Sequence, residues 1–343
     1  MAQKMIKKNL FIEALHCRNK ERAPVWLMRQ AGRYMPEYRA LRAKYSFLEM
    51  CHQPELVAEV TQQPIRAFGM DAAILFSDIL VIPEALKVGL RFDEGAGPVI
   101  ERPVTSPCDV AALPKVDLRE ALDYVVQGIR QVLQTLNVPL IGFCGAPFTL
   151  ASYMIEGRTS RDLRKTKQWM LRDPTSFHAL LDRLADDAIA YLEMQAEAGV
   201  EAVQIFDSWA GVLGHAQFCE FSLAYLKKIV DRVKLKVPVI LFCKGASVFA
   251  PDLVLANPSA ISIDWNARLS NLRPIIPFSI ALQGNLDPDL LYAPLPHLRR
   301  EVKALMDSMK GDPGYIFNLG HGITPEVPVE AVKELVDCVK GYR

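Results

Sequence analysis

The chain has little of what marks membrane, nucleic-acid-binding or disulfide-built proteins. Its longest apolar runs, such as residues 237–243, fall far short of the roughly 18 residues that a membrane-spanning helix needs. The 40 lysines and arginines nearly balance the 39 aspartates and glutamates, so no excess of positive charge is available for nucleic acid or an anionic membrane. We therefore expect neither partner, and expect a small-molecule ligand instead.

Cysteine and histidine occur without the spacings that build disulfide frameworks or metal sites. The seven cysteines are odd in number and never spaced as C-x-x-C. The six histidines form no H-x-x-H or H-E-x-x-H pattern. The N-terminus lacks a continuous apolar run followed by a cleavage site of small residues. We expect reduced cysteines, no metal and a cytoplasmic location.

What the chain does have is length and apolar content. With 343 residues, half of them hydrophobic, it can bury one large core, and we predict a single domain over 1–343 with a short N-terminal extension over about 1–20. Eight short β-rich runs read as strands buried on both faces. These runs are 25–28, 72–76, 140–143, 202–206, 239–242, 260–263, 280–282 and 315–318.

Helical patterns separate these runs. Apolar residues share one helix face before Gly199 and again after Pro328. The first face is Leu181, Leu184, Ala188, Tyr191 and Leu192, and the second is Val332, Leu335, Val336 and Val339. Eight alternating strands and helices predict an α/β fold, a (β/α)8 TIM barrel. An open doubly wound sheet is the alternative, although no glycine-rich nucleotide-binding loop follows any strand.

Two segments carry local predictions of their own. Pro64 interrupts the helical pattern over 55–68, so we expect that helix to be kinked or shortened. The proline- and glycine-rich stretch 95–114 is expected to be a long loop.

In a barrel the carboxyl ends of all strands meet at one mouth, so polar residues just after each run should face one cavity. The candidates are Arg29, Gln30, Ala31, Gly32 and Arg33 after the first run, Ser77 and Asp78 after the second, Tyr153 beyond the third, Asp207 and Ser208 after the fourth, and His321 after the eighth.

The arginines of the first run suit an anionic ligand. Arg29 and Arg33, followed by Arg39 and Arg42, form a dense cationic cluster whose guanidinium forks match carboxylates or phosphates. The alternative is a solvated basic loop. The strand-end position and Gly32, which allows close backbone approach, favour ligand binding.

Asp78 follows the apolar run AAILFS, so its carboxylate should be poorly solvated and in need of a partner. A helix cap or an ion pair within the protein is an equal alternative. His321 lies between two glycines, and such a turn histidine can bind an anion, move a proton or only hold the loop. Tyr153 and Ser208 gain weight only by converging with the others. Lys244 could form a Schiff base, although strand-end lysines are commonly just solvated.

Several segments together resemble the uroporphyrinogen decarboxylase family. The strongest are PVWLMRQAGRYMPEYR at 24–39 and GFCGAPFTL at 142–150, which resemble that family's two signatures. Further matches are FSDIL at 76–80, YMIEG at 153–157, FDSWAG at 206–211, GNLDP at 284–288 and NLGHG at 318–322. Phe148 is a departure, because many members of the family have tryptophan there.

The resemblance implies a homodimeric barrel that converts uroporphyrinogen, a polycarboxylate tetrapyrrole, to coproporphyrinogen by four decarboxylations without cofactor or metal. It implies that Arg29, Arg33 and the residues between them bind substrate carboxylates, and that Asp78 faces the pyrrole N–H groups. Tyr153, Ser208 and His321 would complete the substrate site. Arg29, Arg33 and Asp78 would be the catalytic residues.

Two other functions stay open. A corrinoid-linked methyltransferase of the same superfamily would bind zinc through an H-x-C pair and a later cysteine, where this chain has Leu241-Phe242-Cys243 and His321. A tetrapyrrole-binding protein without catalysis is the second alternative.

Overall fold

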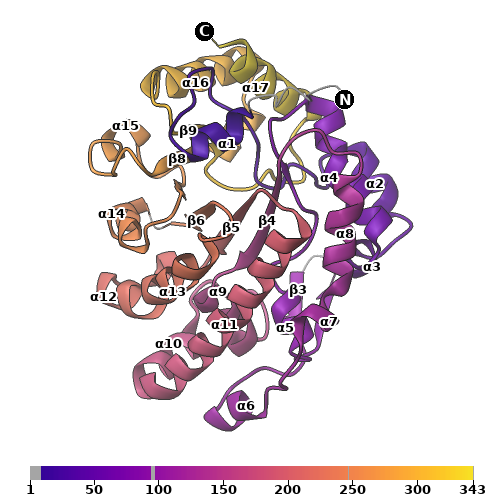
Figure 1. The fold of residues 1–343 in the computed structure, drawn as a ribbon, viewed down its shortest axis with the longest axis vertical. Helices are drawn as coiled ribbons and strands as arrows, with labels where there is room; N and C mark the ends of the chain where they lie inside the picture. Colours follow the sequence, from indigo (N-terminus) through magenta and orange to yellow (C-terminus); the bar gives the residue numbers. More distant parts are fainter. Residues whose placement is uncertain (1–8, 94–96, 246, 343) are drawn as a thin grey trace, which may run out of the picture.

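A curled parallel sheet forms the centre of the computed structural model, which describes residues 9–342 except 94–96 and 246 (Figure 1). Its seven strands are ordered β1-β4-β5-β6-β7-β8-β9, so sequential strands are neighbours and all pairs are parallel. The strands are β1 (Ala73–Ile74), β4 (Leu140–Gly145), β5 (Ala202–Asp207), β6 (Val239–Cys243), β7 (Ala260–Ser262), β8 (Ala281–Leu286) and β9 (Tyr315–Leu319).

Residues 24–28 occupy the position between β9 and β1. The Phe317 N–H donates to the Pro24 carbonyl at 2.9 Å, and the Asp71 N–H donates to the Val25 carbonyl at 2.8 Å. The predicted first strand is thereby reduced to one bridge, Val25 to Phe317. The backbone ladder does not extend to Met28, because its N–H donates to the side-chain oxygen of Asn318 at 3.1 Å rather than to a backbone carbonyl of a neighbouring strand. The barrel architecture is confirmed, with seven laddered strands instead of eight, and the doubly wound alternative is wrong.

Helices cover the outside of the sheet (Figure 1). The longer ones are α4 (Pro54–Phe68), α8 (Asp123–Leu133), α9 (Pro147–Glu156), α10 (Arg164–Arg172), α11 (Pro174–Ala198), α13 (Ala224–Val233), α16 (Leu295–Ser308) and α17 (Val329–Gly341). Shorter ones are α1 (Leu10–Leu15), α2 (Pro36–Arg42), α3 (Phe47–His52), α5 (Val81–Ala85), α6 (Pro107–Ala112), α7 (Leu118–Ala121), α12 (His215–Phe218), α14 (Ala250–Leu253) and α15 (Leu269–Leu272). Single turns are η1 (Ala210–Val212), η2 (Cys219–Leu223), η3 (Ser247–Phe249), η4 (Val254–Ala256) and η5 (Pro288–Tyr292).

Both predicted apolar faces are buried, one on α11 and one on α17. Gly199 ends α11 with φ 114°, a conformation that side chains disfavour. Both helix predictions are therefore confirmed.

Two local predictions differ from the structure: the helix is not shortened at Pro64, and the stretch 95–114 is not only a loop. Helix α4 continues through Pro64 to Phe68. The stretch predicted as a loop contains β3 (Gly97–Ile100), which pairs antiparallel with β2 (Leu90–Asp93), and helix α6. The sequence held the signal for α6, because Ser106 accepts from the Asp109 N–H and Pro107 stands in the first helical turn.

The predicted N-terminal extension contributes to the core. Phe11, Ala14 and Leu15 of α1 are buried among the side chains that fill the barrel interior, including those of Ile141 and Ile316. Figure 1 shows α1 beside β8 and β9. Burying three apolar side chains stabilises the attachment of this helix by several kcal/mol, at roughly 1.5–3 kcal/mol for each large one.

A polar network crosses the barrel interior. The Trp26 indole donates to the Gln283 side-chain oxygen at 2.9 Å, and the Gln283 amide donates to Gln204 and Ser262, both at 2.9 Å. Gln204, Ser262 and Gln283 come from strands β5, β7 and β8, respectively, whereas Trp26 lies in the segment 24–28. Such paired groups offset the cost of burying polar atoms and fix the relative positions of the strands.

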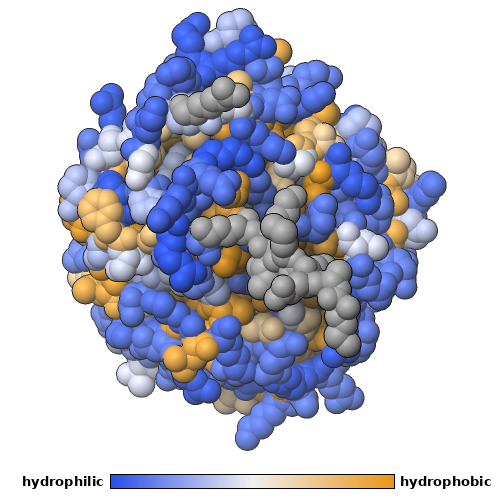
Figure 2. Space-filling model, turned by 45° about the horizontal axis from the view of Figure 1, so that its top comes forward, coloured by the Kyte–Doolittle hydropathy of each residue, from blue (hydrophilic) through white to orange (hydrophobic). Residues whose placement is uncertain are grey.

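The surface is mixed. On the face shown in Figure 2, hydrophilic residues predominate and hydrophobic ones lie in small separate groups. Among the described residues, no helix combines the length and hydropathy needed to cross a membrane.

Candidate active site

Asp78 lies beyond β1 with its carboxylate only partly accessible. Burial raises its pKa to about 6, although the Leu80 N–H, which donates to it at 2.8 Å, and the charge of Arg29 both favour the ionised form. The cap that formed the alternative interpretation therefore exists, but it occupies one oxygen. In the described part of the chain, the other oxygen accepts no hydrogen bond and makes no ion pair. The group is mostly ionised at neutral pH and keeps acceptor capacity for a ligand.

Arg29 is exposed and adopts φ 59°, a left-handed conformation that is uncommon for arginine. Its side chain passes over Gly322, where an added Cβ would clash with the arginine methylene groups. Backbone strain of this kind costs of order 1–3 kcal/mol and concentrates at ligand sites. The strain is maintained by the structure on either side of Arg29.

Gln30 supplies that support. Its side chain is buried, accepts from the Leu27 N–H at 3.2 Å and donates to the Ala72 carbonyl at 3.2 Å. The Tyr34 hydroxyl donates to the Gln30 carbonyl at 2.6 Å. The side chain of this predicted substrate-binding residue is therefore engaged with the protein backbone. Ala31 and Gly32, half-buried, form the rest of the turn.

The four arginines predicted to form one cluster make different contacts. Arg39 donates to the carbonyls of Arg33 and Tyr34, both at 2.9 Å, and Arg42 donates to the Tyr45 carbonyl. These two side chains stabilise the local backbone. Arg33 is exposed, and in the described part of the chain its guanidinium makes no hydrogen bond. Of the four arginines in the predicted cluster, Arg29 and Arg33 are thus the ones whose guanidinium groups make no hydrogen bond within the described residues.

His321 is a neutral group in this structure. Burial lowers its pKa to about 3, and the charges of Arg29 and Lys244 contribute. Its ring packs beside Phe242 with centroids 5.9 Å apart. The imidazole can therefore donate and accept hydrogen bonds without carrying charge at neutral pH. Lys244 is exposed, which does not favour the Schiff-base alternative.

Tyr153 and Ser208 lie in the segments that follow two neighbouring strands, β4 and β5. Tyr153, on α9 after β4, is half-buried with its ring 5.9 Å from that of Trp209. Burial raises its pKa, and the negative charge of Asp78 adds to the effect, so the two groups are close enough to interact. Ser208 is half-buried immediately after β5. Phe148 is fully buried against Phe177, consistent with a packing role.

Asp264 is a candidate that the sequence interpretation missed. One oxygen accepts from the Ser247 hydroxyl and from the Asn266 N–H at 2.9 Å, while the other is buried with no partner among the described residues. Asp264 directly follows the predicted strand 260–263, and Asp78 follows the predicted strand 72–76 after one intervening residue. The same strand-end signal could have found it.

The site residues thus converge in part. The charges of Arg29 and Asp78 act on each other, and both act on Tyr153. The charge of Arg29 also acts on His321. Two exposed arginines and a partly buried acid, with neutral hydrogen-bonding groups, can bind a molecule with several carboxylates and an N–H-rich centre.

Comparison with known proteins bears on what this arrangement does. The family model described as uroporphyrinogen decarboxylase (URO-D) matches residues 6–342. The chain is similar to the uroporphyrinogen decarboxylase of Protochlamydia amoebophila, at 61% identity over 97% of this chain and 91% of that protein. It is 45% identical to that of Vibrio cholerae, over 97% of each chain. Among solved structures, a methyltransferase from Methanosarcina mazei matches with TM-score 0.82 at 21% identity, covering 96% of this chain and 97% of that one.

Proposed function

The chain belongs to the uroporphyrinogen decarboxylase family, and from that membership we propose that it decarboxylates the four acetate side chains of uroporphyrinogen III to give coproporphyrinogen III. The observation that carries the proposal is Asp78. Its carboxylate lies beyond β1 with one oxygen free of protein partners in the described part of the chain, next to the charge of Arg29. A tetrapyrrole presents both carboxylates and central N–H groups to such a pair.

Substrate recognition divides between the two kinds of charge. Arg29 and Arg33 bind the acetate and propionate carboxylates, because guanidinium groups bind carboxylates in a bidentate manner. Asp78 accepts hydrogen bonds from the pyrrole N–H groups. Tyr153, Ser208 and neutral His321 complete the substrate site as hydrogen-bonding groups. Gln30, Ala31 and Gly32 hold the turn that presents the two arginines.

The reaction needs an electron sink, and the substrate supplies it. Protonation of a pyrrole ring carbon creates a cation, and cleavage of the bond between the acetate methylene and its carboxylate returns an electron pair to that ring. Carbon dioxide leaves, and a proton taken up at the methylene carbon completes a methyl group. Loss of the proton first added to the ring carbon then restores the aromatic pyrrole, so one proton is consumed for each carboxylate removed. The ionised Asp78 stabilises the cationic ring. The ring proton comes from an arginine beside the acetate or from solvent that the arginines orient.

The methyltransferase alternative lacks its ligands. Leu241 and Cys243 belong to the core between sheet and helices, whereas Phe242 points into the barrel interior. The likeness to the Methanosarcina protein, at 21% identity, concerns the fold alone.

Three further properties belong to the proposal. We propose a single domain, supported by one large cluster of buried side chains drawn from the whole chain between Val25 and Val339. We propose a cytoplasmic, homodimeric enzyme on the family resemblance, to be tested by sedimentation at assay concentrations. We propose that no cofactor takes part, which the substrate's own electron sink supports.

One assay tests the activity. Purified protein is incubated anaerobically with uroporphyrinogen, and the oxidised products are separated by their number of carboxylates. We expect species with seven, six, five and four carboxylates to appear in order. Unchanged substrate that stays bound to the protein would favour a tetrapyrrole-binding protein without catalysis.

A further inference from the structure

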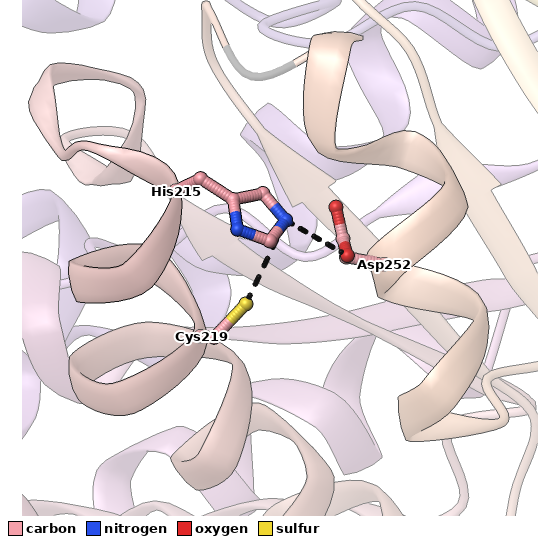
Figure 3. A group of neighbouring side chains, drawn as sticks. All are labelled: His215, Cys219 and Asp252. Carbon is pink, nitrogen blue, oxygen red and sulfur yellow. Dashed lines mark hydrogen bonds and ion pairs between the residues drawn. The ribbon is translucent and has the colours of Figure 1, made fainter.

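Three side chains that are not among the candidate active-site residues bring possible metal-binding atoms of three kinds close together. His215, Cys219 and Asp252 offer one nitrogen, one sulfur and one oxygen, and these atoms lie within 4.8 Å of one another. In Figure 3 the His215 ring points toward both the Cys219 sulfur and the Asp252 carboxylate. Nitrogen, thiolate sulfur and carboxylate oxygen are the donors that zinc takes in proteins.

The local structure explains the convergence. His215 begins α12, and Cys219 begins the π-helical turn η2 that continues it, so the two side chains lie on one helix face four residues apart. Single π-helical turns of this kind are frequent at functional sites. Asp252 comes from α14, in the connection after β6. The sequence does not show the group, because a histidine-cysteine spacing of four is outside the histidine-pair patterns considered above.

Two of the three separations between ligand atoms are close to those of a tetrahedral zinc site. His215 Nε2 lies 3.1 Å from Asp252 Oδ1 and 4.0 Å from Cys219 Sγ. Around zinc, bond lengths of about 2.05 Å to nitrogen, 2.1 Å to oxygen and 2.3 Å to sulfur place nitrogen about 3.4 Å from oxygen and about 3.6 Å from sulfur. The two separations from His215 Nε2 differ from these by a few tenths of an ångström, which small side-chain rotations remove.

Solvent reaches the His215–Cys219–Asp252 cluster from one side, and an aromatic side chain packs against it on the other. The His215 side chain is 66% exposed and that of Asp252 24% exposed, so an ion and a water ligand can reach the cluster. Phe249 packs against the His215 ring at 5.9 Å and stacks on Phe218 at 4.3 Å. These contacts restrict the ring before any ion binds.

We propose that His215, Cys219 and Asp252 form a site for a divalent ion of the zinc class, with water as fourth ligand. Binding forms one bond from zinc to each of the three side chains and releases the thiol proton of Cys219 to solvent, with no change of oxidation state. The ion joins the connection after β5 to the connection after β6.

These connections also carry Ser208 and Lys244, and they already touch. A Cβ on Gly211 would collide with the Lys244 carbonyl oxygen. The ion therefore stabilises the packing of two segments at the barrel mouth and takes no part in decarboxylation. This is compatible with a reaction that uses no cofactor.

Cobalt titration of the full chain tests the site. After chelator treatment, Co²⁺ is added and the near-ultraviolet band of a thiolate–cobalt bond is recorded. We expect one equivalent to produce the band and zinc to displace it. Cys219→Ser should abolish the band, and Asp252→Asn should weaken zinc binding about tenfold or more. Cys338→Ser is the matched control, because that thiol is also partly accessible and contacts an acid, Glu334, at 3.3 Å.

Folding and activity complete the test. Circular dichroism of each variant shows whether a lost band reflects a lost site, and Asp252→Asn remains informative if Cys219→Ser does not fold. Zinc should raise the melting temperature of the parent protein and not that of His215→Ala, while both decarboxylate equally per folded molecule. No cobalt band, or a band of equal strength in Cys219→Ser, would overturn the site. Activity that requires zinc and is lost in His215→Ala would overturn its structural role.

Discussion

Two strand-end carboxylates have pKa values raised to about 6 by burial, yet they lie in opposite surroundings. Asp207, at the end of β5, is fully buried, and its two oxygens accept from the hydroxyls of Thr149 and Ser222, both at 2.6 Å. Asp78, beyond β1, accepts one N–H, from Leu80, and remains partly accessible. The pKa is similar, and the remaining hydrogen-bonding capacity is not.

The difference shows which feature marks a functional acid. A raised pKa identifies a desolvated carboxylate, whether it serves folding or ligand binding. Asp207 links α9, β5 and η2, and each of its oxygens already accepts a hydrogen bond from the protein. Asp78 has one oxygen without such a partner in the described part of the chain, and it shares its surroundings with Arg29. Access and unused hydrogen-bonding capacity, rather than titration alone, therefore distinguish the mouth of the barrel from its supporting layer.

The substitution Asp78→Asn should have the largest effect on the rate of decarboxylation. Asparagine keeps the size and one acceptor oxygen but removes the charge, so folding should be preserved while decarboxylation slows by roughly 10²-fold or more, as for other preorganised electrostatic groups. Single-turnover rate and melting temperature are measured on the same preparation. Asp78→Glu, which keeps the charge but extends into space the macrocycle needs, should also be impaired. A stable Asn variant with a near-normal rate would contradict the electrostatic role.

Asp207→Ala should affect stability instead. Two buried hydroxyls lose their acceptor, at roughly 1–3 kcal/mol each, while removal of a desolvated carboxylate offsets part of the loss. We expect a net loss of about 2 kcal/mol in the free energy of unfolding and a change of less than tenfold in the rate per folded molecule. Denaturant unfolding measures the first and single-turnover assays the second. A rate loss as large as that of Asp78→Asn in a stable protein would remove the distinction.

The sequence predicted the fold from patterns that depend on burial alone. Short apolar runs and the apolar faces before Gly199 and after Pro328 need only a core to be satisfied, and both helices and seven of the eight strands follow. The first strand could not be predicted in detail, because it depends on a side chain, Asn318, that replaces a backbone partner. The path of α4 through Pro64 depends equally on tertiary packing.

The candidate site was predictable as a set of strand-end residues but not as a set of contacts. Asp78 and Asp207 carry the same sequence signal, and only the folded chain separates them. Arg39 and Arg42 continue the arginine pattern of Arg33 yet bond to backbone carbonyls. Which side chain meets backbone and which meets solvent depends on long-range geometry.

Arg33→Ala should sharpen the comparison on the cationic side. The guanidinium is exposed and makes no hydrogen bond within the described residues, so its loss should leave stability within about 0.5 kcal/mol of the parent. Loss of a carboxylate contact should raise KM by roughly tenfold. Arg66→Ala, which removes an exposed arginine paired with Glu59 at 2.6 Å on α4, controls for net charge. A sharp fall in melting temperature with normal kinetics would assign Arg33 a structural role.

The pH dependence should give the smallest effect and the most specific one. Burial raises the folded-state pKa of Asp78 to about 6 from an ordinary value of 3.8, so the folded protein binds an extra proton between these values. The contribution of Asp78 to stability is therefore greatest below about pH 4 and is lost as the pH rises through 6.

Catalysis needs the opposite state, the ionised carboxylate, so kcat/KM should be about half-maximal near pH 6 and fall about tenfold for each pH unit below it. In Asp78→Asn the part of each dependence that Asp78 causes should disappear. The residual rate should lose its acidic limb near pH 6, and the variant should gain stability relative to the parent on going from pH 5 to pH 8. The titration of Asp207, whose pKa burial also raises to about 6, contributes to stability in both proteins and cancels in this comparison. His321, whose pKa is about 3, does not titrate in this window and cannot produce the limb. An acidic limb near pH 6 that persists in the Asn variant would assign the titration to another group.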